Sequence, residues 1–135
     1  MIRAAALIAT VALSACATGS GPERSFDDPA VQQVLVLPVP EYFATLAIAS
    51  DIARNCARYR YDAELDSALN SLRNADDRGS RAALTQRAAI TMETDVRQRS
   101  FMARHGLASL DGDLCPAADA EMLTASAISA MLVPV

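Results

Sequence analysis

Several residue types that carry chemistry are scarce or missing in this sequence. All 12 basic residues are arginine, tryptophan is absent, and His105 is the single histidine. Without lysine, no side-chain amine can act as a base or form a Schiff base. The arginine-only usage is typical of codon bias in a GC-rich genome. Because aromatics are few and alanines many, we expect a core of small aliphatic side chains, which suits closely packed helices.

Metal-binding patterns are also lacking. The three cysteines contain no Cys-x-x-Cys spacing, and one histidine is too few to complete a typical zinc site. The stretch Asp111-Gly112-Asp113 looks like part of a calcium loop, but it lacks the later ligands, the glycine and the bidentate glutamate of an EF-hand. We therefore expect a turn there, and no metal or cofactor.

No apolar run is long enough for a confident membrane span. The longest begins after Arg3 and reaches Ala17, short of the about 20 residues that a transmembrane helix needs, and it then breaks into TGSGP. One positive charge followed by Ala, Leu, Ile and Val is the pattern of a secretory signal peptide. We expect residues 1–15 to be this signal.

The signal ends in Leu13-Ser14-Ala15-Cys16, which resembles the lipobox of bacterial lipoproteins, where a dedicated peptidase cuts before the cysteine. The resemblance makes Cys16 the lipidated N-terminus, held in the bilayer by acyl chains such as palmitate at about 0.8 kcal/mol per buried methylene. In enteric bacteria an Asp after the cysteine retains the protein in the inner membrane. Ala17 therefore favours the outer membrane, facing the periplasm. The alternative is a plain signal peptide that contains a cysteine.

The mature chain, Cys16 to Val135, would be acidic. Without Arg3 it holds eleven basic and sixteen acidic residues, a net charge near −5. A nucleic-acid partner is disfavoured, because phosphate binding depends on clustered positive charge. The length suits one domain with a tether and a modest core.

Assigning Cys16 to the lipid leaves Cys56 and Cys115, an even pair in an oxidising compartment, and we expect them to form a disulfide. The bridge would close a loop of about 60 residues, which the chain-entropy model values at about 4 kcal/mol.

Residues 16–40 have the composition of a linker, because they contain four of the six prolines and an acidic patch from Glu23 to Asp28. Within it, the apolar stretch VQQVLVL lies between Pro29 and Pro38. It can pack along the domain, or it can pair with a partner protein. The residues that would make this partner contact are Val31, Val34, Leu35, Val36 and Leu37.

From Glu41 the apolar residues follow helical spacing. A first helix is expected from Glu41 to near Tyr61, with Asp51 on its wet side. Asp62 is expected to cap a second helix, and its buried stripe would be Leu65, Leu69 and Leu72.

A third helix is expected from Ser80 to His105, because Gly106 supplies a typical stop. This position makes His105 a C-terminal helix residue rather than a catalyst. A last helix would begin at Pro116 to Asp119. On these two helices, the residues expected to face the core are Ala83, Leu84, Ala88, Met92, Val96, Met122, Leu123, Ala127, Ile128 and Met131. The predicted fold is all-α, a small four-helix bundle over residues 41–135, with the disulfide joining its first helix to the start of its last.

Three stretches carry a resemblance: AIASDIARNC, ending at Cys56; FMARHGL, which contains His105; and CPAADAE, beginning at Cys115. Together they resemble a family of small alphaproteobacterial envelope proteins grouped as a domain of unknown function. The likeness runs from Pro40 to the C-terminus and implies a helical fold with the disulfide. Members have ordinary signal peptides, so the lipobox departs from the family pattern. The resemblance implies no chemistry.

No nucleophile, base and orienting group can be assembled from the sequence. We expect a non-enzymatic envelope lipoprotein that binds or scaffolds another envelope component. The alternative is a periplasmic chaperone or inhibitor, which would expose an apolar patch of more than a few hundred Å². An enzyme is least favoured, since it would need carboxylates such as Glu93 and Asp95 to meet in a cleft with raised pKa values.

Overall fold

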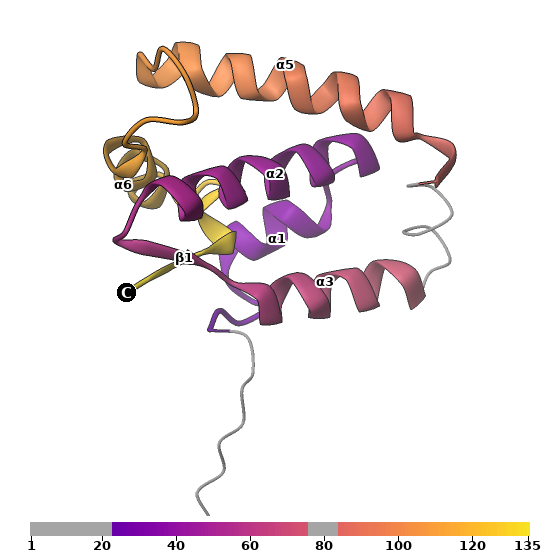
Figure 1. Ribbon diagram of the computed structural model, residues 1–135. Coiled ribbons are helices and arrows are strands. Elements are labelled where there is room, and N and C mark those ends of the chain that lie inside the picture. The colour runs from indigo at the N-terminus through magenta and orange to yellow at the C-terminus, as the bar shows by residue number, and fades with distance from the viewer. Residues whose placement is uncertain (1–22, 76–83) are drawn as a thin grey trace, which may run out of the picture.

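The computed structural model describes residues 23–75 and 84–135, and these are mostly helical (Figure 1). A 3₁₀ turn, η1 (Ser129–Met131), and two short strands, β1 (Tyr59–Tyr61) and β2 (Leu132–Pro134), accompany the helices. The helical prediction is confirmed, but the four-helix bundle is not what forms. The five α-helices of the described residues are α1 (Pro29–Leu35), α2 (Val39–Asn55), α3 (Ala63–Ala75), α5 (Arg87–His105) and α6 (Cys115–Leu123).

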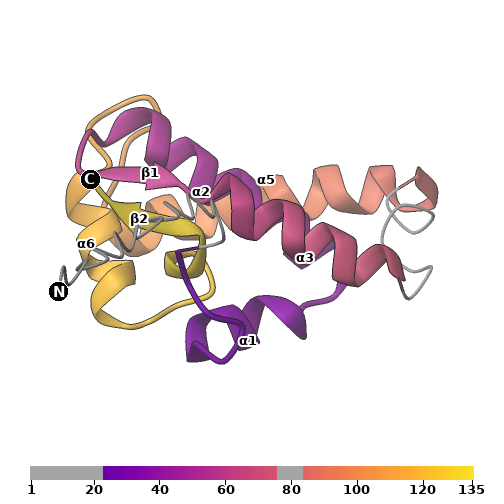
Figure 2. The same cartoon turned by 90° about the horizontal axis from the view of Figure 1, so that it is seen from below.

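Helix α2 occupies the middle of the molecule. Figure 1 shows it between α5 on one side and α3 on the other, and its most extensive contacts are with α5. At one end, β1 and β2 form an antiparallel pair that brings the C-terminus beside the chain leaving α2 (Figure 2). The register places Tyr59 opposite Pro134 and Tyr61 opposite Leu132.

The C-terminal segment is not the single helix that its apolar stripe predicts. Helix α6 ends at Leu123, and Ala125 adopts a left-handed backbone conformation with φ 48°, which breaks a right-handed helix. The chain then enters the interior, where η1 contacts α1, α2, α3 and α6 and Met131 is fully buried. Leu123, expected in the core, is 88% exposed. A turn and a strand therefore fill the space that the last bundle helix was expected to occupy.

Part of the expected linker is a folded helix. Asp28 caps α1 by accepting a hydrogen bond from the Ala30 amide at 2.8 Å, and Pro29 stands in the first turn, where its missing N–H is not needed. Val31 and Val34 are fully buried in the core. The folded domain therefore begins before Glu41, which corrects the predicted boundary.

The connection from α2 to α3 follows the sequence only in part. Helix α2 ends at Asn55 rather than near Tyr61, because the chain extends into β1. Asp62 caps α3 as predicted, since its Oδ1 accepts from the Leu65 amide at 2.9 Å. Leu65 and its stripe neighbour Leu69 are fully buried, whereas Leu72 is exposed.

Helix α5 turns a different face to the core than expected. Ser80 and Ala83 lie outside the described residues, and the other expected core residues, Leu84, Ala88, Met92 and Val96, are exposed. Within α5, all of which is described, only Phe101 is fully buried. Gly106 ends the helix with φ 64°, the left-handed conformation predicted for this stop. The side of α5 that lines a cleft beside α2 is largely polar.

Candidate functional site

A cleft of about 380 Å³ lies between α2, α5 and the segment that follows α6. Its apolar lining includes Ile48 of α2, Val96 of α5 and Ile128 of the C-terminal segment. Its polar lining includes Arg104 of α5 and Glu121 of α6. This volume is within the range of small-molecule sites in proteins.

Glu121 is the most unusual side chain of the cleft, because it is only 2% exposed. Its Oε1 lies 2.8 Å from His105 Nε2 and 3.4 Å from an Arg104 guanidinium nitrogen. Its Oε2 is buried and has no hydrogen-bond partner in the described structure. His105 is fixed by Phe101, whose ring centroid lies 4.6 Å from that of the imidazole. A buried carboxylate oxygen without a donor destabilises the folded state, since it has lost its hydration and gained nothing in exchange.

Polar pairs hold α5 against α2 beside the cleft. Arg97 donates to Glu93 at 2.7 Å and also pairs with Glu41 at the start of α2. Gln98 donates to Asp51 of α2 at 2.8 Å. Asp51 is therefore buried between the helices and not on the wet side where its spacing placed it.

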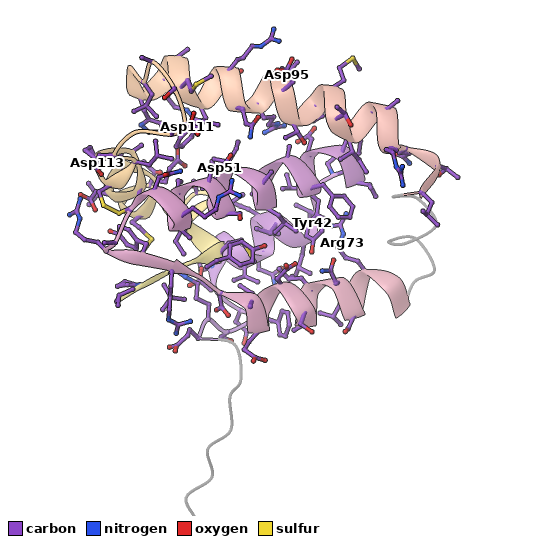
Figure 3. The ribbon with its side chains drawn as sticks, in the orientation of Figure 1. Tyr42, Asp51, Arg73, Asp95, Asp111 and Asp113 are labelled. Atoms are coloured by element: carbon purple, nitrogen blue, oxygen red, sulfur yellow. A yellow bond between two sulfur atoms is a disulfide. The ribbon has the colours of Figure 1, made fainter. Side chains whose placement is uncertain are left out.

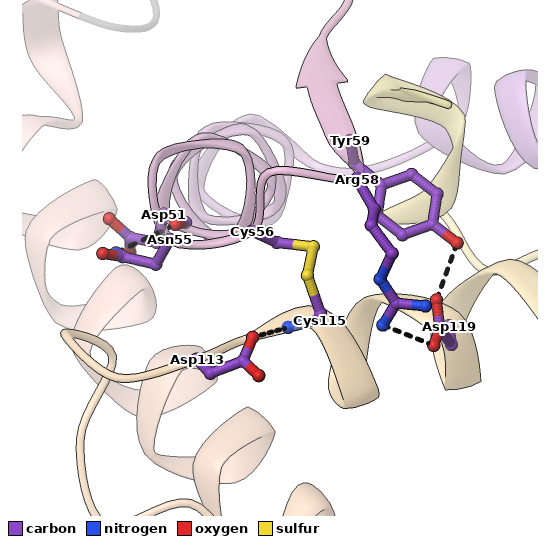
Figure 4. The surroundings of a disulfide bond; sticks show 8 residues. All are labelled: Asp51, Asn55, Cys56, Arg58, Tyr59, Asp113, Cys115 and Asp119. Atoms are coloured by element: carbon purple, nitrogen blue, oxygen red, sulfur yellow. Dashed lines mark hydrogen bonds and ion pairs between the residues drawn. A yellow bond between two sulfur atoms is a disulfide. The ribbon is translucent and has the colours of Figure 1, made fainter. Parts of the chain in front are cut away.

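The disulfide between Cys56 and Cys115 joins the end of α2 to the start of α6, as predicted (Figure 4). Their Cα atoms lie 4.9 Å apart across 59 residues of sequence. Asn55 reinforces the junction, because its side-chain amide donates to the Leu110 carbonyl at 2.9 Å. The Leu114 amide in turn donates to the Asn55 carbonyl at 3.1 Å. These contacts give the Asn-Cys pair a structural role.

Asp113 and Asp119 also act structurally around this bridge. Asp113 accepts a hydrogen bond from the Cys115 amide at 2.9 Å, so the Asp-Gly-Asp stretch ends in a turn that leads into α6. Asp119 accepts from the Tyr59 hydroxyl at 2.8 Å and pairs with Arg58 at 2.8 Å. In the described part of the chain, no group of three or more His, Cys, Asp or Glu side chains is placed to hold a metal ion.

A second polar cluster lies on the opposite side of α2, toward α3 (Figure 3). The Tyr42 hydroxyl donates to Asn70 at 3.1 Å, and Asn70 donates to Asp66 at 2.9 Å. Arg73 lies 4.1 Å above the Tyr42 ring and donates to the Leu37 carbonyl at 2.9 Å, which fastens the chain after α1. The contacts of this cluster hold α2, α3 and the chain after α1 together, which gives it a structural role.

Two causes raise the pKa values of the buried groups in this cluster. Burial, and then the Asp66 charge, raise the pKa of Tyr42 well above its ordinary range, and the pKa of Tyr61 rises for the same reasons. Burial also raises the pKa of Asp66, although hydrogen bonds from Tyr61 and Asn70 oppose this. At neutral pH the two tyrosines remain protonated.

The predicted partner segment does not form an exposed apolar surface. Val31 and Val34 are buried, Leu35 and Leu37 are half-buried, and Val36 alone of the five is exposed, at 78%. The structure therefore uses this segment for packing, the first of the two roles that its sequence allowed. Cys16 lies outside the described residues.

The two carboxylates named for a possible enzyme are not brought together. Glu93 lines the cleft and pairs with Arg97, whereas Asp95 is exposed and pairs with Arg99 at 2.5 Å. His105 ends α5 as predicted, and the sequence does not predict its contact with Glu121. Glu121 lies four residues after Ala117 and three after Ala118, on the same buried face of α6. A carboxylate on a face of small apolar residues is the one sequence feature that could have indicated its burial.

Comparisons with protein-family models, with curated proteins and with solved structures find no match to this chain. The family resemblance of the sequence therefore stays a prediction. None of the described helices is both long and apolar enough to cross a bilayer.

Proposed function

We propose that this chain is a bacterial envelope lipoprotein, anchored through acylated Cys16, whose helical domain binds another envelope protein without catalysing a reaction. The observation that carries the proposal is the disulfide. It occupies Cys56 and Cys115, which leaves Cys16 as the one cysteine outside the bridge. Bridged cysteines are typical of an oxidising compartment, in agreement with a secretory signal before Cys16.

The length of chain between the anchor and the domain limits how far the domain can lie from the membrane. Only residues 17–22 separate Cys16 from Glu23, and six residues span at most about 20 Å. Glu23 is already part of the domain, because its amide donates to Asp62 at 3.1 Å and its carboxylate pairs with Arg60. The domain would thus sit close to the bilayer.

This arrangement turns α5 away from the lipid. Figure 1 shows the described chain beginning on the side of the molecule opposite α5. On the α5 outer face, the exposed apolar residues Ala88, Met92 and Val96 recur every four residues, and Val96, at the end of this row, also lines the cleft. Residues at this spacing form the ridge used in the commonest class of helix–helix packing. The occupant that fits this face is therefore a helix of a partner protein on the far side from the anchor.

The anchor is tested at the mature N-terminus. Cells fed labelled palmitate should incorporate label into the native protein and into Cys115→Ser, which keeps the lipobox, but not into Cys16→Ser. Mass spectrometry should find a diacylated or triacylated Cys16 as the first residue, and fractionation should place the protein in the outer membrane. An unmodified N-terminus at any other residue would contradict the proposal.

The α5 outer face is tested by site-specific crosslinking in living cells. A photoreactive residue at position 92, where Met92 is 67% exposed, should capture one envelope protein reproducibly. Ala88→Asp, four residues before Met92 and outside the cleft lining, should abolish the capture, because a charge on the ridge disfavours burial. Leu123→Asp, at an exposed apolar site on α6, is the control and should leave the capture intact. A product made of two copies of this chain, or equal loss in the control, would refute a helical partner on this face.

The same exposed face supports a second candidate, a periplasmic chaperone or inhibitor. Contiguous exposed apolar surface is what such proteins use to hold clients. In that case the crosslinker at position 92 should capture many unfolded envelope proteins rather than one. Purified protein should also suppress client aggregation, and Ala88→Asp should weaken this activity.

A further inference from the structure

The cleft beside Glu121 has the chemistry of a ligand site, and this inference does not depend on the anchor, although the cleft shares Val96 with the α5 outer face. Ile48, Val96 and Ile128 line it with aliphatic carbon, and Glu121 and Arg104, which lie 3.4 Å apart, add opposite charges. Small-molecule sites are typically built in this way, with an apolar lining and a few polar groups that fix orientation.

The first ligand group, a charged N–H donor, is inferred from Glu121 Oε2, which has no hydrogen-bond partner among the described residues. Glu121 is almost fully buried, and its other oxygen already has His105 and Arg104. A charged N–H donor would give Oε2 the hydrogen bond that it lacks. Hydrogen bonds between charged groups are stronger than those between neutral groups. This chain has no lysine that could provide an ammonium.

The remaining charges point to the second ligand group. Two arginines and two glutamates line the cleft, so its lining has no net charge. It therefore suits a ligand that carries one positive and one negative group. Arg97 is engaged by Glu93 and Glu41. Arg104 has only the 3.4 Å contact with Glu121 and is 58% exposed, so its guanidinium has donors to spare for a carboxylate. Ser100, also in the lining, has no hydrogen bond through its hydroxyl among the described residues.

We propose that this cleft binds a small aliphatic α-amino acid, with its ammonium on Glu121, its carboxylate on Arg104 and its side chain among Ile48, Val96 and Ile128. Arg104 is the more exposed of the two groups on Glu121, since His105 is 12% exposed. The route to the carboxylate therefore passes the Arg104 side chain. On binding, Arg104 moves from Glu121 Oε1 to the ligand carboxylate, and the ligand ammonium donates to Glu121, with one of its N–H groups on Oε2.

The test compares L-leucine with two analogues that each lack one charge. The probes are L-leucine, 3-methylbutylamine and 4-methylpentanoate, titrated into the mature protein in detergent and followed by the amide signals of Ser100, Ser126 and Ala127. Leucine should bind more than about tenfold tighter than either analogue, because each analogue loses one charge-assisted contact. Equal binding of all three, or no shift with leucine at millimolar concentration, would overturn the proposal.

Matched arginine variants assign the carboxylate contact. Arg104→Gln should weaken leucine about tenfold or more and leave 3-methylbutylamine unchanged. Arg99→Gln, on the same helix and outside the cleft, should change neither. Glu121→Gln should weaken both leucine and the amine, with circular dichroism as the check on folding. If Arg99→Gln weakens leucine as much as Arg104→Gln does, the proposed contact is wrong. These readouts involve no acylation, so their failure leaves the lipoprotein proposal intact, and the reverse also holds.

Discussion

Tyr42 and Tyr61 make the stability of this protein sensitive to alkali. Both lie beside Asp66 and keep their protons in the folded state, because burial and the neighbouring carboxylate raise their pKa values. In the unfolded chain they would ionise near pH 10. Their contribution to stability is therefore fully present below pH 10 and is lost above it, at about 1.4 kcal/mol per pH unit for each tyrosine.

Replacing these tyrosines should make the free energy of unfolding fall less steeply as the pH rises above 10. We expect Tyr42→Phe to cost about 1 kcal/mol at pH 7, since its hydroxyl bonds Asn70, but to lose stability less steeply than the native protein above pH 10. Urea unfolding of both proteins at a series of pH values measures the two slopes. Identical slopes, or tyrosine absorbance that titrates normally in the folded protein, would show that the buried hydroxyls do not cause the loss.

Single residues were predictable where a local rule decides their role. Asp62 caps α3 and Gly106 ends α5, because both functions depend on the backbone immediately around them. Glu121 and Asp51 were not predictable as buried groups, because their partners come from other helices. Polarity alone placed Asp51 in water, whereas Gln98 of α5, together with Arg54 one turn along α2, makes its burial tolerable.

At the scale of elements, α5 shows why an apolar stripe can mislead. Ala88 and Met92 of its stripe face solvent, because Phe101 and the Arg97 pairs dock another side of α5 on the rest of the domain. A helical pattern shows only that one face is apolar. It does not say whether the surface that covers this face is in the same chain.

This view of α5 predicts unequal costs for two substitutions on one helix. Phe101→Ala should destabilise the domain by about 3–5 kcal/mol, because it removes a fully buried ring and leaves a cavity. Met92→Ala should change the free energy of unfolding by less than about 0.5 kcal/mol, since the side chain is mostly exposed. Urea unfolding of the purified variants gives both values. A large loss in Met92→Ala would mean that this face is covered in the isolated protein.

At the scale of the whole molecule, the sequence predicted helical content and the disulfide but not the arrangement. The bundle fails because α1 joins the core from within the expected linker, and the C-terminal residues Ser129 to Met131 are buried between the helices. Short elements of this kind have no periodicity to detect. Their places are set by long-range packing, which a local pattern does not contain.

The disulfide joins two segments of the domain that are 59 residues apart in the sequence, so its removal should affect the stability of the whole domain. Cys56 ends α2, the central helix, and Cys115 opens α6, so the bridge and Asn55 together fix the loop that closes one end of the molecule. Cys56→Ser, Cys115→Ser and the double variant should each lower stability by about 4 kcal/mol, the chain-entropy value for this loop length. The losses should not add, since each change removes the same bond. Thermal unfolding of the three variants, beside native protein with and without reductant, measures this. Additive losses, or two free thiols in protein taken from the envelope, would mean that the cysteines act separately.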